Sequence, residues 1–192
     1  MFNSVTILGM LALCFVCISC AAEKNPIVEG EPAPKFTLPT IDDEEISLDD
    51  VLAENEFVLV DFWSIYCAPC IARFPPLREI YAEYKDHGFE VITIAGENSR
   101  EDWEQGTEEN ELPWIDVGDM EDGEMKGWNG PTVQAYGVHL TGMPRMFLID
   151  SDGIVVKDNP SKDELLKELK SLRDDTEDTD VESTPTPEQQ ES

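Results

Sequence analysis

The sequence has few positive charges for its length. Its 192 residues include 13 lysines and arginines against 42 aspartates and glutamates, which gives a formal net charge of −29. Such a chain repels a phosphate backbone, so we do not expect nucleic acid as a partner. The excess of carboxylates indicates a heavily solvated surface. The alternative interpretation is an acidic surface that binds one basic partner.

Cysteines are also scarce in the part of the chain that can fold. Three of the five, Cys14, Cys17 and Cys20, lie in an N-terminal apolar run, which leaves Cys67 and Cys70. Two cysteines exclude a four-cysteine zinc site and allow one intramolecular disulfide.

The N-terminal apolar run is too short for a comfortable membrane span. Residues 5–19, VTILGMLALCFVCIS, have about the length of a signal-peptide core and lead into ISCAA. This ending resembles a bacterial lipobox, so we expect residues 1–20 to be a lipoprotein-type signal peptide with Cys20 as the lipidated residue. Ordinary cleavage near Ala21 is the alternative. Either way the domain is expected in the periplasm or cell envelope, where a cysteine pair can be oxidised.

Composition divides the remainder of the chain into three parts. Residues 21–32 are polar and predict a tether, and residues 33–172 have the apolar content of one globular domain. Residues 173–192 are rich in Asp, Glu, Thr, Ser and Pro without apolar periodicity, so they predict an acidic disordered tail.

The first half of the predicted domain alternates between strand and helix patterns. KFTLPTIDDEEISLDDVL predicts a strand pair and a turn of helix, and EFVLVDFW and FEVITIAG are typical of buried strands. From Cys67 to Lys85, apolar residues recur at spacings of three and four, which predicts a helix that Pro75 and Pro76 should kink.

The second half begins with a helix predicted at SREDWEQGTEEN, with Ser99 as its cap. Residues 113–135 predict loops. RMFLID and GIVVKD flank Ser-Asp-Gly and predict a hairpin, and SKDELLKELKSL predicts a closing helix with a capping box from Ser161 to Glu164. The order predicts an α/β fold in which a mixed central sheet has helices on both faces and an N-terminal hairpin extension.

Four segments carry a resemblance to a known family. They are GEPAPKFTLPTI, FVLVDFWSIYCAPC, FPPLREIYAEYKDHGFEVITIAGE and YGVHLTGMPRMFLIDSDGIVV. Over about residues 30–170 the chain resembles the thioredoxin fold, and more narrowly the exported thioredoxin-like proteins of the TlpA/redoxin (AhpC/TSA-like) type. The resemblance implies a thiol–disulfide oxidoreductase without cofactor or metal that acts on exported proteins with disulfides. A membrane electron donor and a lipid anchor are the further partners it suggests.

The Cys-Ala-Pro-Cys motif has the residues that disulfide exchange requires. Cys67 falls at a predicted helix N-terminus, where free N–H groups and the helix dipole lower a thiol pKa. Cys70 lies one turn later, so Cys67 should attack a substrate disulfide and Cys70 should resolve the mixed disulfide. A purely structural disulfide is the alternative, although so small a ring constrains the unfolded chain little.

The resemblance gives further residues their expected roles. Pro144 matches the cis-proline of the family, and Met143 matches the residue whose backbone pairs with substrate. The motif residues Tyr66, Ala68 and Pro69 are expected to bind substrate at the same site. Asp61 matches a buried aspartate that exchanges protons with the second cysteine, and burial should raise its pKa. An Asp that reaches solvent or caps a backbone group is the alternative.

Two arginines depart from the family pattern. Arg73 stands where many exported relatives have glutamate, and its charge would favour the thiolate if it faces the sulfurs. The alternative places it on the solvated helix face. Arg145 follows the cis-proline and would select acidic substrates or contact the tail.

Two other functions are alternatives for this sequence. A Cu(I) metallochaperone of thioredoxin fold would use Cys67, Cys70, His139 and Met143 as soft ligands. A peroxide-reducing redoxin is weaker because neither cysteine lies in a P-x-x-x-T/S-x-x-C motif.

Overall fold

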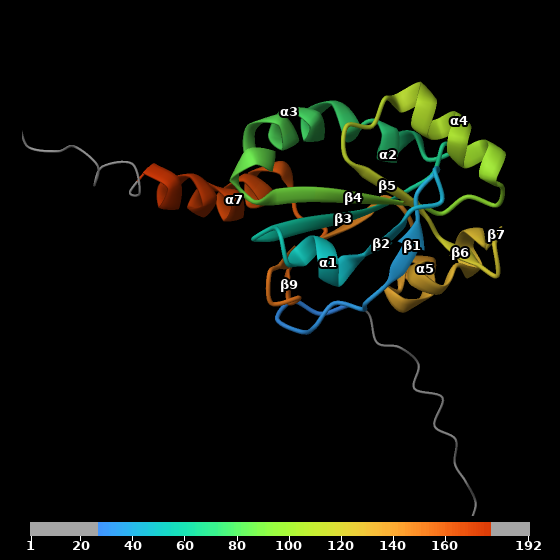
Figure 1. Ribbon diagram of the computed structural model, residues 1–192, viewed down its shortest axis with the longest axis horizontal. Helices are drawn as coiled ribbons and strands as arrows, with labels where there is room; N and C mark the ends of the chain where they lie inside the picture. Colours follow the sequence, from blue (N-terminus) through green and yellow to red (C-terminus); the bar gives the residue numbers. More distant parts are fainter. Residues whose placement is uncertain (1–26, 178–192) are drawn as a thin grey trace, which may run out of the picture.

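A five-stranded sheet forms the centre of the molecule in the computed structural model, which describes residues 27–177 (Figure 1). Its strand order is β5-β4-β3-β8-β9, with β3, β4 and β5 parallel and with β8 and β9 antiparallel to their neighbours. The strands are β3 (Phe57–Trp63), β4 (Phe89–Ala95), β5 (Ile115–Gly118), β8 (Arg145–Asp150) and β9 (Val155–Asp158).

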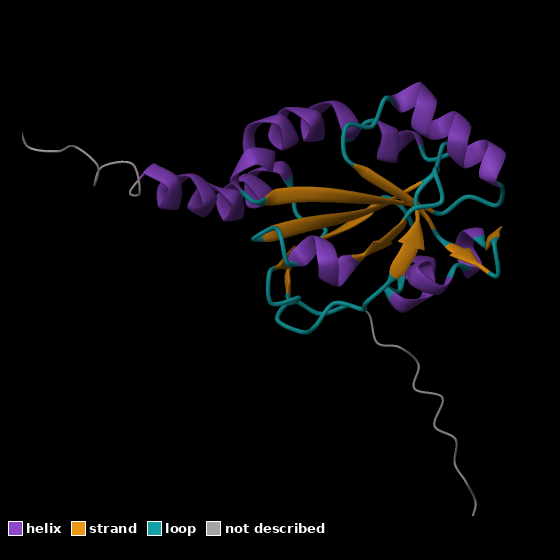
Figure 2. Cartoon of the chain, viewed as in Figure 1, coloured by secondary structure: helices purple, strands orange, loops and turns teal. Residues whose placement is uncertain are grey.

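Helices cover both faces of this sheet, each over its own apolar core (Figure 2). One face carries α2 (Ala68–Ile71), α3 (Phe74–Tyr84), η1 (Lys85–His87), α4 (Arg100–Asn110) and α7 (Lys162–Glu177). The other carries α1 (Leu48–Leu52), α5 (Pro131–Ala135) and α6 (Val138–Thr141). The predicted fold class is confirmed.

Two small antiparallel pairs flank the central sheet. The predicted N-terminal hairpin is present as β1 (Thr37–Pro39) and β2 (Glu45–Ser47). A second hairpin consists of β6 (Met120–Glu121) and β7 (Glu124–Met125), and it is followed by the short helix η2 (Gly127–Asn129).

The prediction of loops for residues 113–135 was wrong. β5 adds a third parallel strand there, pairing Ile115 with Ile92 and Val117 with Ile94. The segment is short and contains Asp116, so its sequence lacks the apolar run of the other buried strands. Buried donors satisfy that carboxylate, and the strand is stable because of these tertiary contacts.

The helix predicted from Cys67 to Lys85 is interrupted, not merely kinked. α2 ends at Ile71, and α3 begins at Phe74. Pro75 and Pro76 have no N–H to donate to the carbonyl groups four residues earlier, so the first helix ends and the prolines occupy the first turn of the second. The interruption separates the cysteine pair from the longer helix behind it.

Segments near both ends of the described residues pack against the fold. Gly30 N donates to Val155 O and Val155 N donates to Glu31 O, so part of the predicted tether pairs with β9. At the other end α7 continues past residue 172, where Arg173 pairs with Glu83 of α3. The predicted signal peptide, Cys20 and most of the predicted tail lie outside the described residues.

Among residues 27–177, no helix has the length and apolar character needed to cross a membrane.

Candidate active site

Cys67 and Cys70 form a disulfide at the carboxyl end of the central strand. Cys67 is the N-cap of α2, where its Sγ accepts a hydrogen bond from Cys70 N at 3.3 Å. Cys67 is partly exposed and Cys70 is fully buried, with its Sγ 3.9 Å from the carbonyl oxygen of Phe62. Only one sulfur of the pair is therefore open to a protein substrate.

A cleft of about 380 Å³ opens beside the exposed sulfur. The predicted residues Tyr66, Pro69 and Met143 line it together with Cys67. The Met143–Pro144 peptide bond is cis, as the resemblance implies, and Ala68 is exposed next to the first cysteine. The cleft lining is completed by Ser64, Gly96, Glu97, Asn98 and Trp128.

Glu97 and Trp128 line the cleft, although neither lies in a motif that predicts a site residue. Glu97 follows β4, and its buried carboxylate accepts a hydrogen bond from Ile65 N. Burial raises its pKa, and hydrogen bonds from Ile65 and Ser64 oppose that rise. Its position at the carboxyl end of a parallel strand was the available signal, because ligands gather at that edge of an α/β sheet. Trp128, in the short helix η2 far along the chain, had no comparable signal.

Asp61 is buried in β3, and neither of its carboxylate oxygens has a hydrogen-bond partner. Its side chain shares with Leu59 and Trp63 the sheet face against which Cys70 packs. Burial raises its pKa from 3.8 to about 7, and the charge of Arg73 opposes the rise. Neither alternative position, in solvent or as a cap, is observed.

Arg73 and Arg145 are both engaged with protein groups. Arg73 is partly buried, its Nη2 donates to Asn159 Oδ1 at 3.3 Å, and its charge acts on Asp61. It also lines an apolar groove of about 190 Å³ between α3 and α7. Arg145 forms an ion pair with Asp158 and lies over the ring of Phe147, so it is not free to select acidic substrates.

The start of α4 fixes the position of Tyr66 from the side. Asp102 accepts the Tyr66 hydroxyl at 2.9 Å through Oδ1 and the Ser99 hydroxyl at 2.8 Å through Oδ2. Ser99 also caps the helix, as predicted, by accepting from Asp102 N. Arg100 ties the same turn to Asp43 and to the carbonyl group of Ile41.

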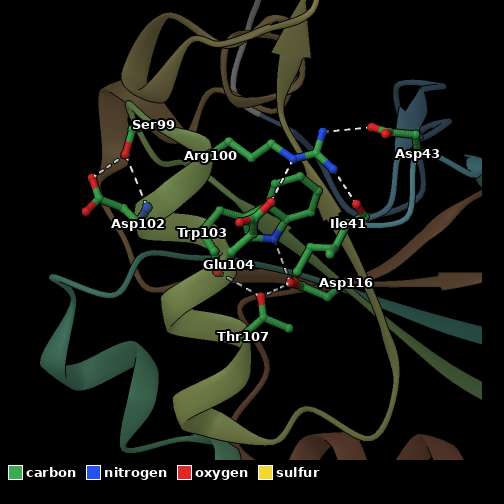
Figure 3. A network of polar contacts seen from close by, with 9 residues as sticks. All are labelled: Ile41, Asp43, Ser99, Arg100, Asp102, Trp103, Glu104, Thr107 and Asp116. Atoms are coloured by element: carbon green, nitrogen blue, oxygen red, sulfur yellow. Dashed lines mark hydrogen bonds and ion pairs between the residues drawn. The ribbon is translucent and has the colours of Figure 1, made fainter.

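A second buried carboxylate holds α4 against the sheet behind the site. Asp116 Oδ2 accepts from Trp103 Nε1 at 2.7 Å and from Thr107 Oγ1 at 2.6 Å (Figure 3). Its Oδ1 accepts from Trp63 Nε1 at 3.0 Å and from Thr93 Oγ1 at 2.7 Å. Burial raises the pKa of Asp116, and these hydrogen bonds oppose the rise. The cluster joins β3, β4, β5 and α4.

His139 does not line the cleft. Its Nδ1 is buried without a hydrogen-bond partner. Within residues 27–177, no three or more His, Cys, Asp and Glu side chains are grouped so that they could hold a metal ion. The copper-site prediction therefore gains no support from the geometry.

Comparison with known proteins places this chain among thioredoxin-like thiol–disulfide oxidoreductases. The profile of the AhpC/TSA family matches residues 29–158. Thiol-disulfide oxidoreductase ResA of Oceanobacillus iheyensis is 32% identical over 98 residues, a match that spans 48% of this chain and 50% of that protein. The protein of the same name from Bacillus cereus is 28% identical over 149 residues, covering 74% of this chain and 78% of that one.

Solved structures agree over the folded part. The thioredoxin domain of a thiol-disulfide oxidoreductase from Bacteroides vulgatus has a TM-score of 0.65 and 27% identity, covering 76% of this chain and 98% of that domain. A thiol-disulfide oxidoreductase from Bacteroides fragilis has a TM-score of 0.65 and 26% identity, covering 74% and 99% of the two chains.

Proposed function

Since this chain belongs to the AhpC/TSA family, we propose that its Cys67–Cys70 pair exchanges disulfides with protein substrates outside the cytoplasm. The enzyme class, a thioredoxin-like thiol–disulfide oxidoreductase, is that of its relatives and structural neighbours. The nature of the substrates, the roles of the individual residues and the location are our proposals.

The unequal exposure of the two sulfurs is the observation that carries this proposal. Cys67 borders the cleft, whereas Cys70 is fully buried. A purely structural disulfide gains nothing from an open cleft beside one sulfur. An exchange reaction needs that arrangement, because one thiolate must reach the substrate and the second must lie next to it to resolve the mixed disulfide.

The reaction proceeds in two thiol–disulfide exchanges. In the reduced protein the Cys67 thiolate attacks one sulfur of the substrate disulfide, and the other substrate sulfur leaves as a thiolate. The Cys70 thiolate then attacks Cys67 Sγ, which releases the second substrate thiolate and closes the Cys67–Cys70 disulfide. Two electrons pass from the protein to the substrate, and two protons pass to the substrate thiolates. The reverse sequence oxidises a dithiol substrate.

Asp61 receives the proton that Cys70 must lose before it attacks. The carboxyl lies on the sheet face that packs against Cys70, and a pKa of about 7 suits proton exchange near neutral pH. The positive charge of Arg73 keeps the pKa of Asp61 from rising further. Arg73 therefore acts on the reaction indirectly, through Asp61.

The substrate segment binds along the exposed residues around Cys67. Tyr66, Ala68 and Pro69 are all exposed beside the sulfur. Met143 lies across the cleft, and its backbone precedes the cis-proline Pro144, where it pairs with an extended chain. This contact would supply affinity independent of substrate sequence.

Export and anchoring complete the proposal. The apolar run at residues 5–19 directs the chain out of the cytoplasm, and Cys20 receives the lipid that holds the domain to a membrane. A membrane electron donor would keep the pair reduced there. A Cys20→Ser variant should move from the membrane fraction to the soluble fraction of cells, and an unchanged distribution would contradict the anchor.

Single-cysteine variants test the exchange itself. Reduced Cys70→Ser should accumulate a mixed disulfide with an oxidised protein substrate, because its resolving thiol is missing. Cys67→Ser is the matched control and should trap none. Equal trapping by both variants would overturn the assigned roles, and a wild-type protein that reduces no disulfide would overturn the function.

A further inference from the structure

Trp128 is a large aromatic side chain held half-exposed beside the reactive sulfur. It is 48% exposed and lines the cleft together with Cys67, although it lies outside the Cys-Ala-Pro-Cys motif. Tyr66, 77% exposed, lines the same cleft. Exposed aromatic side chains at a binding surface supply contact area at low cost in conformational entropy.

The segment that carries Trp128 is firmly anchored. Gln134 Nε2 donates to Trp128 O at 2.6 Å. The buried Asp119 carboxylate accepts from Thr132 N at 3.1 Å and from Val133 N at 2.7 Å, which fixes the start of α5 directly behind the loop. Gly127 has a positive φ of 53°, and a side chain there would collide with Asn98. Trp128 is therefore presented to the cleft by a short helix, η2, whose position is fixed by these contacts.

The cleft is free of positive charge. Its described lining contains one acidic residue, Glu97, and no Lys, Arg or His. The hairpin of β6 and β7, which precedes Trp128 in the chain, carries exposed Glu121, Asp122 and Glu124. Lys126 is paired with Glu124 at 3.0 Å. The whole chain has a formal charge of −29. A positively charged segment is thus attracted to this surface, and a negatively charged one is repelled.

We propose that the cleft between Tyr66 and Trp128 selects substrate segments that carry a lysine or arginine next to the cysteine. The cation lies against these exposed aromatic side chains, and the net negative charge of the chain favours its approach. This inference rests on the proposed function, because it names the substrates of the same exchange. It assigns Trp128 a role in specificity and not in the chemical step.

The test compares rates on matched peptides. Each peptide has one cysteine joined through a disulfide to a fluorescent thiol, and the neighbouring residue is lysine, norleucine or glutamate. Norleucine has nearly the shape of lysine without its charge. The reduced wild-type protein should act on the lysine peptide about two- to fivefold faster than on the norleucine peptide. The glutamate peptide should react more slowly than both.

Substitutions at Trp128 locate the selectivity. Trp128→Leu should bring the ratio of lysine to norleucine rates close to one, and Trp128→Phe should give an intermediate ratio. Val28→Ala removes an exposed apolar side chain that is not among the residues lining the cleft, and it should leave the ratio at the wild-type value.

The outcomes separate this inference from the proposed function. Equal or faster reaction of the norleucine peptide would show that the cleft recognises apolar bulk and would overturn the proposal. An unchanged ratio in Trp128→Leu would do the same. If neutral hydroxyethyl disulfide is not reduced either, the proposed function itself has failed.

Discussion

At the scale of the single residue, Asp61 makes folding stability depend on pH. Its pKa is raised from 3.8 to about 7 by burial, so the folded protein keeps a proton that the unfolded chain releases above about pH 4. The free energy of unfolding therefore falls as pH rises from about 4 to about 7, and this loss is complete above the folded pKa. Three pKa units correspond to about 4 kcal/mol.

Urea unfolding of the oxidised protein checks this expectation. The free energy of unfolding of Asp61→Asn minus that of wild type should increase by about 3 kcal/mol from about pH 4.5 to about pH 8. The reason is that asparagine has no proton to lose. Using the difference between the two proteins cancels the contributions of the other buried carboxylates. A difference that is independent of pH would mean that Asp61 titrates near its ordinary value.

Arg73 gives a second residue-scale prediction. Its positive charge lowers the pKa of Asp61, so Arg73→Gln should raise that pKa above the wild-type value. Carbon-13 NMR titration of the Asp61 carboxyl measures the change. The matched control is Arg78→Gln. Arg78 lies in α3 and donates to the carbonyl group of Asn110, so its substitution should leave the titration of Asp61 unchanged.

Residues that lie within one motif are predictable from the sequence, whereas residues that tertiary packing brings to the cleft are not. The two cysteines and Asp61 are identifiable because a buried strand, a carboxylate and a helix start follow one another in the chain. Trp128 reaches the cleft because Asp119 and Gln134 fix the segment around η2, far along the sequence. No local pattern predicts that contact.

At the scale of the elements, Asp116 determines how firmly α4 is held behind the site. Asp116→Ala leaves two buried indole N–H groups, those of Trp63 and Trp103, without an acceptor. We expect a loss of about 3 to 5 kcal/mol in the free energy of unfolding. Chemical denaturation measures it. Glu108→Ala, on the exposed side of α4, should change stability by less than about 0.5 kcal/mol.

An intermediate variant sharpens the test of this cluster. Asp116→Asn keeps one acceptor oxygen, so it should cost less than the alanine substitution. If both variants are as stable as wild type, the hydrogen bonds to Asp116 do not hold α4 in place.

The capping box of α7 is a second property of an element. Ser161 Oγ accepts from Glu164 N at 3.3 Å, and Glu164 Oε2 accepts from Ser161 N at 2.9 Å. Ser161→Ala should lower stability by about 1 kcal/mol, because a backbone N–H of the first turn loses its partner. Ser171→Ala, in the same helix but away from its start, is the control for thermal unfolding and should cost less. Equal losses would show that the box contributes nothing.

Helices were predictable where local signals were strong, and the third parallel strand was not. Ser99 and Ser161 are both observed as caps. They were predictable because a capping side chain bonds to a residue only three positions further along the chain. β5 depends instead on pairing with β4 and on donors that reach Asp116 from three other elements. Such long-range pairing has no signature in a four-residue segment.

At the scale of the whole molecule, the imbalance of charge should make stability rise with salt. Forty-two acidic residues face 13 basic ones, so the compact state holds many carboxylates without a cation to offset them. Surface ion pairs such as Lys35–Asp49 are exposed and contribute little each, so their loss in salt is the smaller effect. Raising NaCl from about 0.01 M to about 1 M shortens the Debye length from about 30 Å to about 3 Å.

The thermal midpoint of the oxidised protein at neutral pH should therefore increase by several degrees over this range of salt. Repeating the measurement at about pH 4.5 provides the control. This pH is close to the ordinary pKa values of aspartate and glutamate, so more carboxyl groups are protonated and the repulsion is weaker. The salt-induced rise should shrink there. A midpoint that falls with salt at neutral pH would mean that the ion pairs outweigh the repulsion, and that the excess charge is not a cost to this fold.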